Sequence, residues 1–182
     1  LTTTIKAQKI DFDMTGRRSE EVTMNGFTSW QVGQLGYGAS ATTTVGRACV
    51  TVKNSTGGYQ LRTSWYKAGI NSDKLINDGI HHDGSPQRST SITVQVSGLS
   101  NGTHSLQAYH NNCDGLNGAS ITVSVNGRKV TTVNPSNRAA STAKAAKSYV
   151  TFTGSSATIV YSSNTDFFIN SLEFDVADAN AL

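Results

Sequence analysis

Three short segments of the sequence concentrate aromatic, amide, acidic and basic side chains: residues 65–67, 78–83 and 109–114. A sugar ring packs its axial hydrogens on the flat face of a Trp or Tyr ring, and its hydroxyls need both donors and acceptors. The three segments supply both kinds of group, so their chemistry favours holding a carbohydrate. The side chains that we expect to contact one are Trp30, Trp65, Tyr66, Lys67, Asp78, His81, Tyr109, His110, Asn111, Asn112 and Asp114.

The stacking platform in this interpretation is Trp30, Trp65 or Tyr66. Adjacent side chains on a strand point to opposite faces of the sheet, so at most one of Trp65 and Tyr66 enters the core. Two structural alternatives stay open. In one, Trp65 fills the core and Tyr66 is an ordinary strand residue. In the other, the Asn and Asp residues after Tyr109 only cap a turn through local hydrogen bonds.

Proton transfer on a sugar is a second interpretation of the same segments. A polysaccharide lyase needs a cation near a uronate carboxylate and a side chain that moves the neighbouring proton, roles that Lys67, Tyr109 and His110 could fill. The motifs of phosphate-binding loops and dinucleotide sites are absent from the sequence. We therefore expect the chain to be a binding domain rather than an enzyme, with a lyase or another sugar-active enzyme as the alternative.

Acidic residues near both ends of the sequence predict a calcium site. Asp11 and Asp13 alternate with apolar residues near the start, and Glu173 and Asp175 do so near the end. Both pairs should face away from the core, where their oxygens would suit Ca²⁺ if the two strands are neighbours. The alternative is that outward acidic residues on edge strands deter aggregation without an ion.

The cysteines are two, Cys49 and Cys113, each beside a strand-like run. An even number in an exported chain permits one disulfide, and two free buried thiols are the alternative.

The elements that must position these groups are strands. Apolar and polar residues alternate with a period of two in many short runs, and the Asn126-Gly127 pair is a strong hairpin signal. Residues 138–147 are rich in alanine but lack a broad apolar stripe, so they form either a short helix or an extended loop. The clearest strand runs are residues 10–14, 48–52, 92–96, 121–125, 129–133, 149–152 and 157–161.

The composition limits the class of protein. Charged residues make up 15% of the 182, the net charge is +3, and Ser, Thr, Asn and Gly occur in nearly every segment, which suits a secreted protein. The basic residues are scattered singly, which argues against nucleic acid as a partner. No apolar stretch approaches the length of a membrane span, so we expect no membrane partner. One monomeric domain over residues 1–182 is the simplest organisation for this length.

Short motifs follow one another along the chain at residues 10–12, 26–30, 75–79, 98–106, 125–127 and 168–174. Their succession resembles galactose-binding-like and malectin-like β-sandwich domains, which are commonly attached to secreted polysaccharide lyases, esterases and glycoside hydrolases. The resemblance spans almost the whole chain and implies an all-β jelly roll that binds a polysaccharide or oligosaccharide through loop aromatics and polar groups. It also implies a structural Ca²⁺ and a catalytic domain in the same parent protein, and a lectin-like adhesion domain is the alternative.

Overall fold

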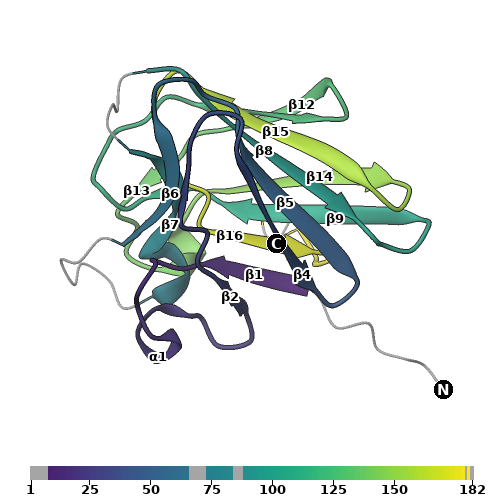
Figure 1. The fold of residues 1–182 in the computed structure, drawn as a ribbon, viewed down its shortest axis with the longest axis horizontal. Coiled ribbons are helices and arrows are strands. Elements are labelled where there is room, and N and C mark those ends of the chain that lie inside the picture. The colour runs from purple at the N-terminus through teal and green to yellow at the C-terminus, as the bar shows by residue number, and fades with distance from the viewer. Residues whose placement is uncertain (1–7, 66–72, 84–87, 179, 181–182) are drawn as a thin grey trace.

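The protein is built almost entirely of strands (Figure 1). A computed structural model of the chain describes residues 8–65, 73–83, 88–178 and 180. Its helical elements are α1 (Ser19–Val22) and the short 3₁₀ turns η1 (Lys74–Ile76) and η2 (Thr142–Lys144). Its strands are β1 (Gln8–Phe12), β2 (Thr28–Trp30), β3 (Gln34–Leu35), β4 (Ser40–Val45), β5 (Ala48–Asn54), β6 (Gln60–Trp65), β7 (Asp78–Asp83), β8 (Thr90–Ser97), β9 (Thr103–Tyr109), β10 (Asn111–Asn112), β11 (Ile121–Val125), β12 (Arg128–Val133), β13 (Ser136–Asn137), β14 (Lys147–Thr153), β15 (Ala157–Ser163) and β16 (Ser171–Phe174).

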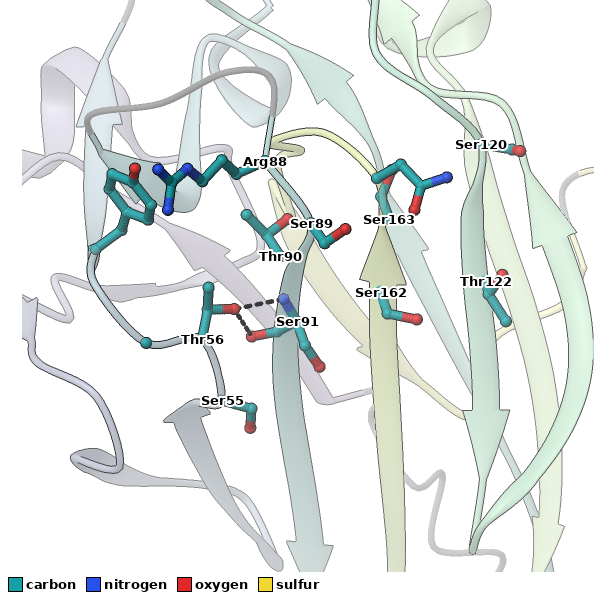
Figure 2. A pocket seen from close by; sticks show the side chains of 13 residues that line it. Ser55, Thr56, Arg88, Ser89, Thr90, Ser91, Ser120, Thr122, Ser162 and Ser163 are labelled. Atoms are coloured by element: carbon teal, nitrogen blue, oxygen red, sulfur yellow. Dashed lines mark hydrogen bonds between the residues drawn. The ribbon is translucent and has the colours of Figure 1, made fainter.

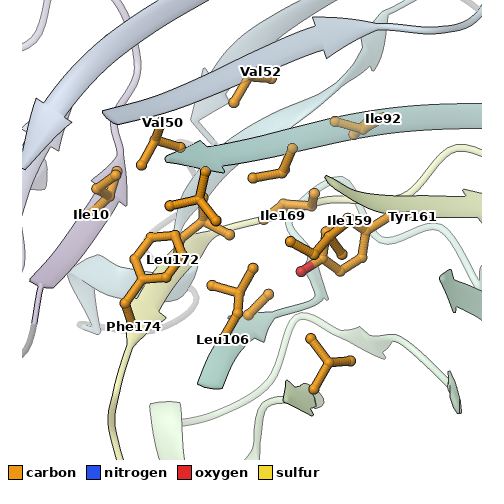
Figure 3. Close-up of a cluster of buried hydrophobic side chains, with 14 of the residues drawn as sticks. Ile10, Val50, Val52, Ile92, Leu106, Ile159, Tyr161, Ile169, Leu172 and Phe174 are labelled. Atoms are coloured by element: carbon orange, nitrogen blue, oxygen red, sulfur yellow. The ribbon is translucent and has the colours of Figure 1, made fainter. Parts of the chain in front are cut away.

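Two large sheets pack face to face and enclose the core (Figures 1 and 3). One has the strand order β14-β9-β16-β1-β2, and the other has the order β12-β11-β15-β8-β5-β4. Every second residue of a strand points inward, as Ile92, Val94 and Val96 do on β8, where they are buried. Across the core they face side chains such as Leu172 and Phe174. The predicted all-β sandwich is therefore confirmed.

The structure tests two further predictions, the hairpin at Asn126-Gly127 and the alanine-rich segment. The chain turns between β11 and β12 at Asn126 and Gly127, whose φ angles of 49° and 84° are those that a tight hairpin turn requires, so this prediction is confirmed. Within residues 138–147 the helical element is the single turn η2 (Thr142–Lys144), and β14 begins at Lys147. Without an apolar stripe to bury, good helix propensity did not produce a longer helix.

A third, smaller sheet of order β3-β6-β7 stands across one end of the sandwich (Figure 1). It is joined to the core where Ile80 on β7 exchanges two backbone hydrogen bonds with Ile169, N–O distances 2.9 and 3.0 Å. The neighbouring residue, Gly79, makes this approach feasible. A Cβ atom added there would lie 2.7 Å from the carbonyl oxygen of Ile169.

Replacement of Gly79 by Ala is therefore expected to destabilise the fold by about 1–3 kcal/mol, because backbone must move to admit the methyl group. Urea denaturation of the variant measures this. Gly36→Ala is the matched control, since nothing lies within 4 Å of a Cβ at that position. Equal stability of Gly79→Ala and wild type would show that β7 does not pack against Ile169 as described.

The predicted disulfide is not present, and Cys49 and Cys113 are both free thiols. Cys49 is half-buried on β5, at the edge of a shallow hollow on the six-stranded sheet. Cys113 follows β10 and is buried, with its Sγ donating to the carbonyl oxygen of Ile76, 3.2 Å. The prediction of a bond between them is wrong, because Cys49 lies on the six-stranded sheet whereas Cys113 is enclosed beside Ile76.

The helices of the described residues are all too short to span a bilayer.

Candidate functional site

A polar groove of about 910 Å³ lies at one end of the six-stranded sheet (Figure 2). Its floor is a row of hydroxyl groups from three adjacent strands, in which Ser162 of β15 pairs with Ser91 of β8 on one side and with Thr122 of β11 on the other. These residues alternate with buried Ile92, Tyr161 and their neighbours, so their hydroxyls point outward. Adjacent strands therefore present these hydroxyl groups at a spacing of about 4.8 Å.

One wall of the groove is the turn that follows β5. Thr56 holds it against β8, because its Oγ1 accepts a hydrogen bond from Ser91 N–H, 2.6 Å, and donates to the carbonyl oxygen of Ser91, 3.2 Å (Figure 2). Farther along the wall, the Arg88 guanidinium lies over the Tyr59 ring, 5.6 Å from its centroid. This wall therefore adds one aromatic ring and one cation to the hydroxyl floor.

The chemistry of the lining is neutral and rich in hydroxyls. None of the described residues that line the groove carries a carboxylate, and Arg88 is the cation among them. Such a surface can exchange hydrogen bonds with a polyhydroxylated ligand in both directions, since each Ser or Thr donates once and accepts twice. The lining residues are Ser55, Thr56, Gly57, Tyr59, Arg88, Ser89, Thr90, Ser91, Ser120, Thr122, Ser162, Ser163 and Asn164.

Several residues predicted to contact a sugar lie inside the protein instead. Asp78, His110, Asn111 and Asn112 are at most 1% exposed, so they cannot reach a glycan at the surface. The prediction does not hold for these four. They lie where irregular backbone crosses the end of the sandwich, and buried backbone groups there need side-chain partners.

Asn111 shows how these polar side chains are used. Its Nδ2 donates to the carbonyl oxygen of Ile76, 3.0 Å, and its Oδ1 accepts from Ser136 Oγ and from Ala139 N–H, both at 2.9 Å. Its own backbone N–H donates to Asn170 Oδ1, 2.7 Å. The amide therefore ties together three segments of chain, and its burial keeps it from a ligand at the surface.

His110 is a core residue as well. One ring nitrogen, Nδ1, lies 3.1 Å from the carbonyl oxygen of Phe168, and the other, Nε2, lies 2.7 Å from Ser148 Oγ. Burial lowers the pKa of His110 to about 4, so its ring is neutral at physiological pH. Tyr109 beside it is 7% exposed, and burial raises its pKa to about 12. With His110 enclosed, the lyase interpretation loses one of its three candidate proton-transfer groups, and Lys67 lies outside the described residues.

The predicted aromatic platforms have different outcomes. Trp30 is half-buried at the edge of the five-stranded sheet, where its ring stacks on Phe12 with 5.5 Å between centroids and packs against the core. The side chain of Trp65, together with Tyr66 and Lys67, lies outside the described residues. Trp30 therefore offers at most one ring face to a ligand.

Three buried carboxylates meet beside β1 and β7. One ligand oxygen each from Asp11, Asp13 and Asp78 lies within 4.8 Å of the others. In every one of them Oδ2 accepts a hydrogen bond, whereas Oδ1 is buried and receives none. Burial, followed by repulsion from its neighbours, raises the pKa of Asp11 to about 9 and raises that of Asp78. The donors to Oδ2 are Met24 N for Asp11, Thr23 Oγ1 for Asp13 and Met14 N for Asp78.

The calcium set predicted from the sequence is divided in the structure. β1 and β16 are antiparallel neighbours, as that prediction required, but Lys9 and not Asp11 lies opposite Glu173. Asp175 follows the end of β16 and contacts the His104 ring, with 2.9 Å between Nδ1 and Oδ2. The two terminal pairs therefore do not converge, and a third carboxylate from β7 joins the first pair instead.

His81 and Asp114 are the predicted residues that the structure brings together near the surface. A carboxylate oxygen of exposed Asp114 lies within 4.8 Å of a ring nitrogen of His81 and an oxygen of Asp166. The His81 ring also contacts Ser64 Oγ, 2.7 Å. Ser64 and Asp166 were missed in the sequence, because they are far apart along the chain and belong to no local motif.

No family model matches the chain, and no curated protein matches it. Solved structures are similar to it. A family 35 carbohydrate-binding module from Clostridium thermocellum is 13% identical, with a TM-score of 0.42, over 76% of this chain and 99% of that chain. Another family 35 module, from an environmental isolate, is 18% identical, with a TM-score of 0.41, over 82% of this chain and 94% of that chain. A family 61 module in complex with β-1,4-galactotriose is 12% identical, with a TM-score of 0.41, over 69% and 86%. These three solved structures to which the chain is similar are themselves carbohydrate-binding modules.

Proposed function

We propose that the chain is a carbohydrate-binding module that holds a polysaccharide in the groove floored by Ser91, Thr122 and Ser162. The observation that supports this is the lining itself, an open row of hydroxyls with a Tyr ring and a guanidinium on one wall. Many neutral groups that both donate and accept match a ligand whose surface is hydroxyl groups. A hydrophobic ligand would leave the same groups without partners, at a cost in free energy for each.

Arg88 bears on which class of sugar the groove prefers. Its guanidinium can form two parallel hydrogen bonds to a carboxylate, so a uronate-containing chain would gain a charge-assisted contact at this wall. We propose that uronate-containing polysaccharides bind more tightly than neutral ones. The contact is exposed, so the gain should be modest and should weaken with salt.

Binding to soluble polysaccharides, measured by calorimetry and by affinity gels, tests the groove. Ser162→Leu fills its floor without adding charge and should weaken binding about tenfold or more, which is about 1.4 kcal/mol. The matched control is Thr151→Leu on the exposed position of β14 in the opposite sheet. Binding unchanged in Ser162→Leu but lost in Trp30→Ala would move the site to the other sheet and reject the groove.

Arg88→Gln separates the two sugar classes in the same assay. We expect it to weaken binding of uronate-containing chains several-fold and to leave neutral chains nearly unaffected, because only a carboxylate uses the charge. Equal loss for both classes would show that Arg88 acts through its packing on Tyr59.

We propose in addition that Asp11, Asp13 and Asp78 hold a structural Ca²⁺. Three hard oxygen donors surround one point, and the Oδ1 atom of each receives no hydrogen bond. A divalent cation would offset the repulsion that raises the pKa values of Asp11 and Asp78. Bound there, it would fasten β1 to the β6–β7 sheet and so fix the end of the sandwich next to the groove.

We also propose that the protein acts outside the cell, as a monomer and in association with a catalytic domain that degrades polysaccharides. The neutral, hydroxyl-rich surface and the sequence resemblance to secreted β-sandwich modules support this setting. Gel filtration with light scattering tests the monomer.

A further inference from the structure

Ser64, His81 and Asp166 form a continuous chain of hydrogen bonds at the end of the sandwich. Ser64 Oγ lies 2.7 Å from His81 Nε2, and His81 Nδ1 lies 2.7 Å from Asp166 Oδ2. The three residues come from β6, β7 and the segment between β15 and β16. Both ring nitrogens are therefore engaged, one by a hydroxyl and the other by a carboxylate.

The β6–β7 pairing explains the first contact. His81 lies opposite Arg62 and Gly79 lies opposite Ser64, so Ser64 and His81 are diagonal neighbours on one face of the pair. Gly79 has no side chain to intervene between them. The same glycine lets the backbone of Ile169 and Asn170 approach this face of the β6–β7 pair.

Further contacts fix the hydrogen bond between His81 and Asp166. Asp166 Oδ1 accepts a hydrogen bond from the backbone N–H of His82, 2.9 Å, which leaves Oδ2 for His81. The His81 ring also stacks on Phe168, with 4.2 Å between centroids and 10° between planes. Imidazole orientation is therefore fixed by a hydrogen bond at each nitrogen and by a ring on one face.

This arrangement selects one tautomer. Burial raises the pKa of Asp166, while the hydrogen bonds from His81 and His82 favour its charged form. A carboxylate at Oδ2 requires the ring proton on Nδ1, so Nε2 carries the lone pair and accepts the Ser64 hydroxyl proton. Exposure also runs in the order that catalysis needs, since Asp166 is 3% exposed, His81 is 8% exposed and Ser64 is half-buried.

We propose that Ser64, His81 and Asp166 are a nucleophilic triad that hydrolyses a carboxylic ester. The geometry meets the requirements for an activated serine, namely a base within hydrogen-bond reach of the nucleophile and a third group that orients the base. The substrate class that fits is an O-acylated sugar, and this part of the proposal rests on the proposed glycan binding. The esterase activity itself does not rest on it.

The reaction balances without a cofactor. Ser64 Oγ bonds to the acyl carbon while its proton passes to His81 Nε2, and the bond from that carbon to the alcohol oxygen breaks as the oxygen takes the proton. Water then attacks the acyl-serine, gives a proton to Nε2 and releases the carboxylic acid as Ser64 regains its hydrogen. Asp166 stays ionised and stabilises the imidazolium in both steps.

Hydrolysis of p-nitrophenyl acetate tests the triad, since this activated ester needs no glycan contact. We expect saturable release of nitrophenol by the purified chain, reduced about a hundredfold or more in Ser64→Ala and His81→Gln. Asp166→Asn should lower kcat with little change in KM, because it alters the tautomer and not the binding. Melting curves of each variant verify that it folds.

The chain contains its own matched control. His104 contacts Asp175 with 2.9 Å between Nδ1 and Oδ2, but its Nε2 faces the carbonyl oxygen of Ser100, which cannot be a nucleophile. His104→Gln should therefore retain full activity. Labelling of the unmodified protein with a fluorophosphonate and mapping of the adduct to Ser64 by mass spectrometry supports the proposal without any variant.

Two results would overturn the triad. One is the absence of both turnover and Ser64 labelling. The other is turnover that survives Ser64→Ala but is abolished by a chelator, which would assign it to a metal held by His81, Asp114 and Asp166. Glycan binding measured on Ser64→Ala keeps the two proposals separate, because failure of either assay leaves the other intact.

Discussion

Removal of calcium is expected to lower the melting temperature of this protein by about 5–10 °C. A cation at one hundred times its dissociation constant stabilises the folded state by about 2.7 kcal/mol, and 1 kcal/mol is worth about 2–4 °C for a domain of this size. Asp11, Asp13 and Asp78 supply this stabilisation only if one carboxylate oxygen of each binds the same ion. Thermal denaturation in calcium, in magnesium and in chelator measures the effect.

Two carboxamide variants locate the site. Asp78→Asn should remove most of the calcium-dependent gain in melting temperature. Asp175→Asn should keep it, because Asp175 is engaged by His104 and lies outside the cluster. The reverse result would restore the ligand set predicted from the sequence and reject the cluster around Asp78.

The pH dependence of the calcium effect follows from the raised pKa of Asp11. The pKa of Asp11 is about 9 in the folded chain, against 3.8 in the unfolded chain. Between these two pH values the folded chain holds a proton that the unfolded chain has lost. The contribution of Asp11 to the stability of the metal-free fold therefore decreases as the pH rises. Calcium binds the ionised form, so it must displace protons at low pH. The gain in melting temperature from calcium should therefore increase between about pH 5 and pH 9, and a constant gain would mean that Asp11 is not a ligand.

The sandwich could be predicted from the sequence because its signal is local. Period-two alternation in β5, β8 and β11 is produced by one buried face and one polar face, and each strand carries that pattern by itself. The same alternation puts Ser91, Thr122 and Ser162 outside. Their convergence into one row depends on which strands are neighbours, which no single segment specifies.

The candidate sites could be predicted only in part, for related reasons. Asp11 and Asp13 were expected to be ligands, but the register of β1 against β16 and the position of β7 decided their third partner. The sequence predicted that the amide of Asn111 lies in a loop and is available to a ligand. In the structure it is buried, because the irregular backbone around it needs hydrogen-bond partners. Ser64 and Asp166 lie 102 positions apart, and a triad is defined by geometry, with no fixed spacing or order.

The contribution of His110 to the stability of the fold is expected to be lost between pH 6.5 and pH 4. Burial holds the pKa of this histidine at about 4, below the 6.5 of the unfolded chain. A depressed histidine pKa means that the unfolded state binds the proton first, so stability present above pH 6.5 is lost as the pH falls toward 4. The loss is on the order of 3 kcal/mol from this one residue. His82, whose pKa is also lowered to about 4, should add to it.

Urea denaturation of His110→Gln at pH 7 and at pH 4.5 tests this expectation. The variant should be less stable than wild type at pH 7, because it loses a packed ring, but this difference from wild type should be smaller at pH 4.5. His104→Gln gives the opposite sign. The pKa of His104 is raised, first by its hydrogen bond to the carbonyl oxygen of Ser100, so its contribution is complete at low pH and is lost as the pH rises through the folded pKa. Removing His104 should therefore cost more stability at pH 4.5 than at pH 7, and an identical pH profile for both variants would show that neither ring contributes in this way.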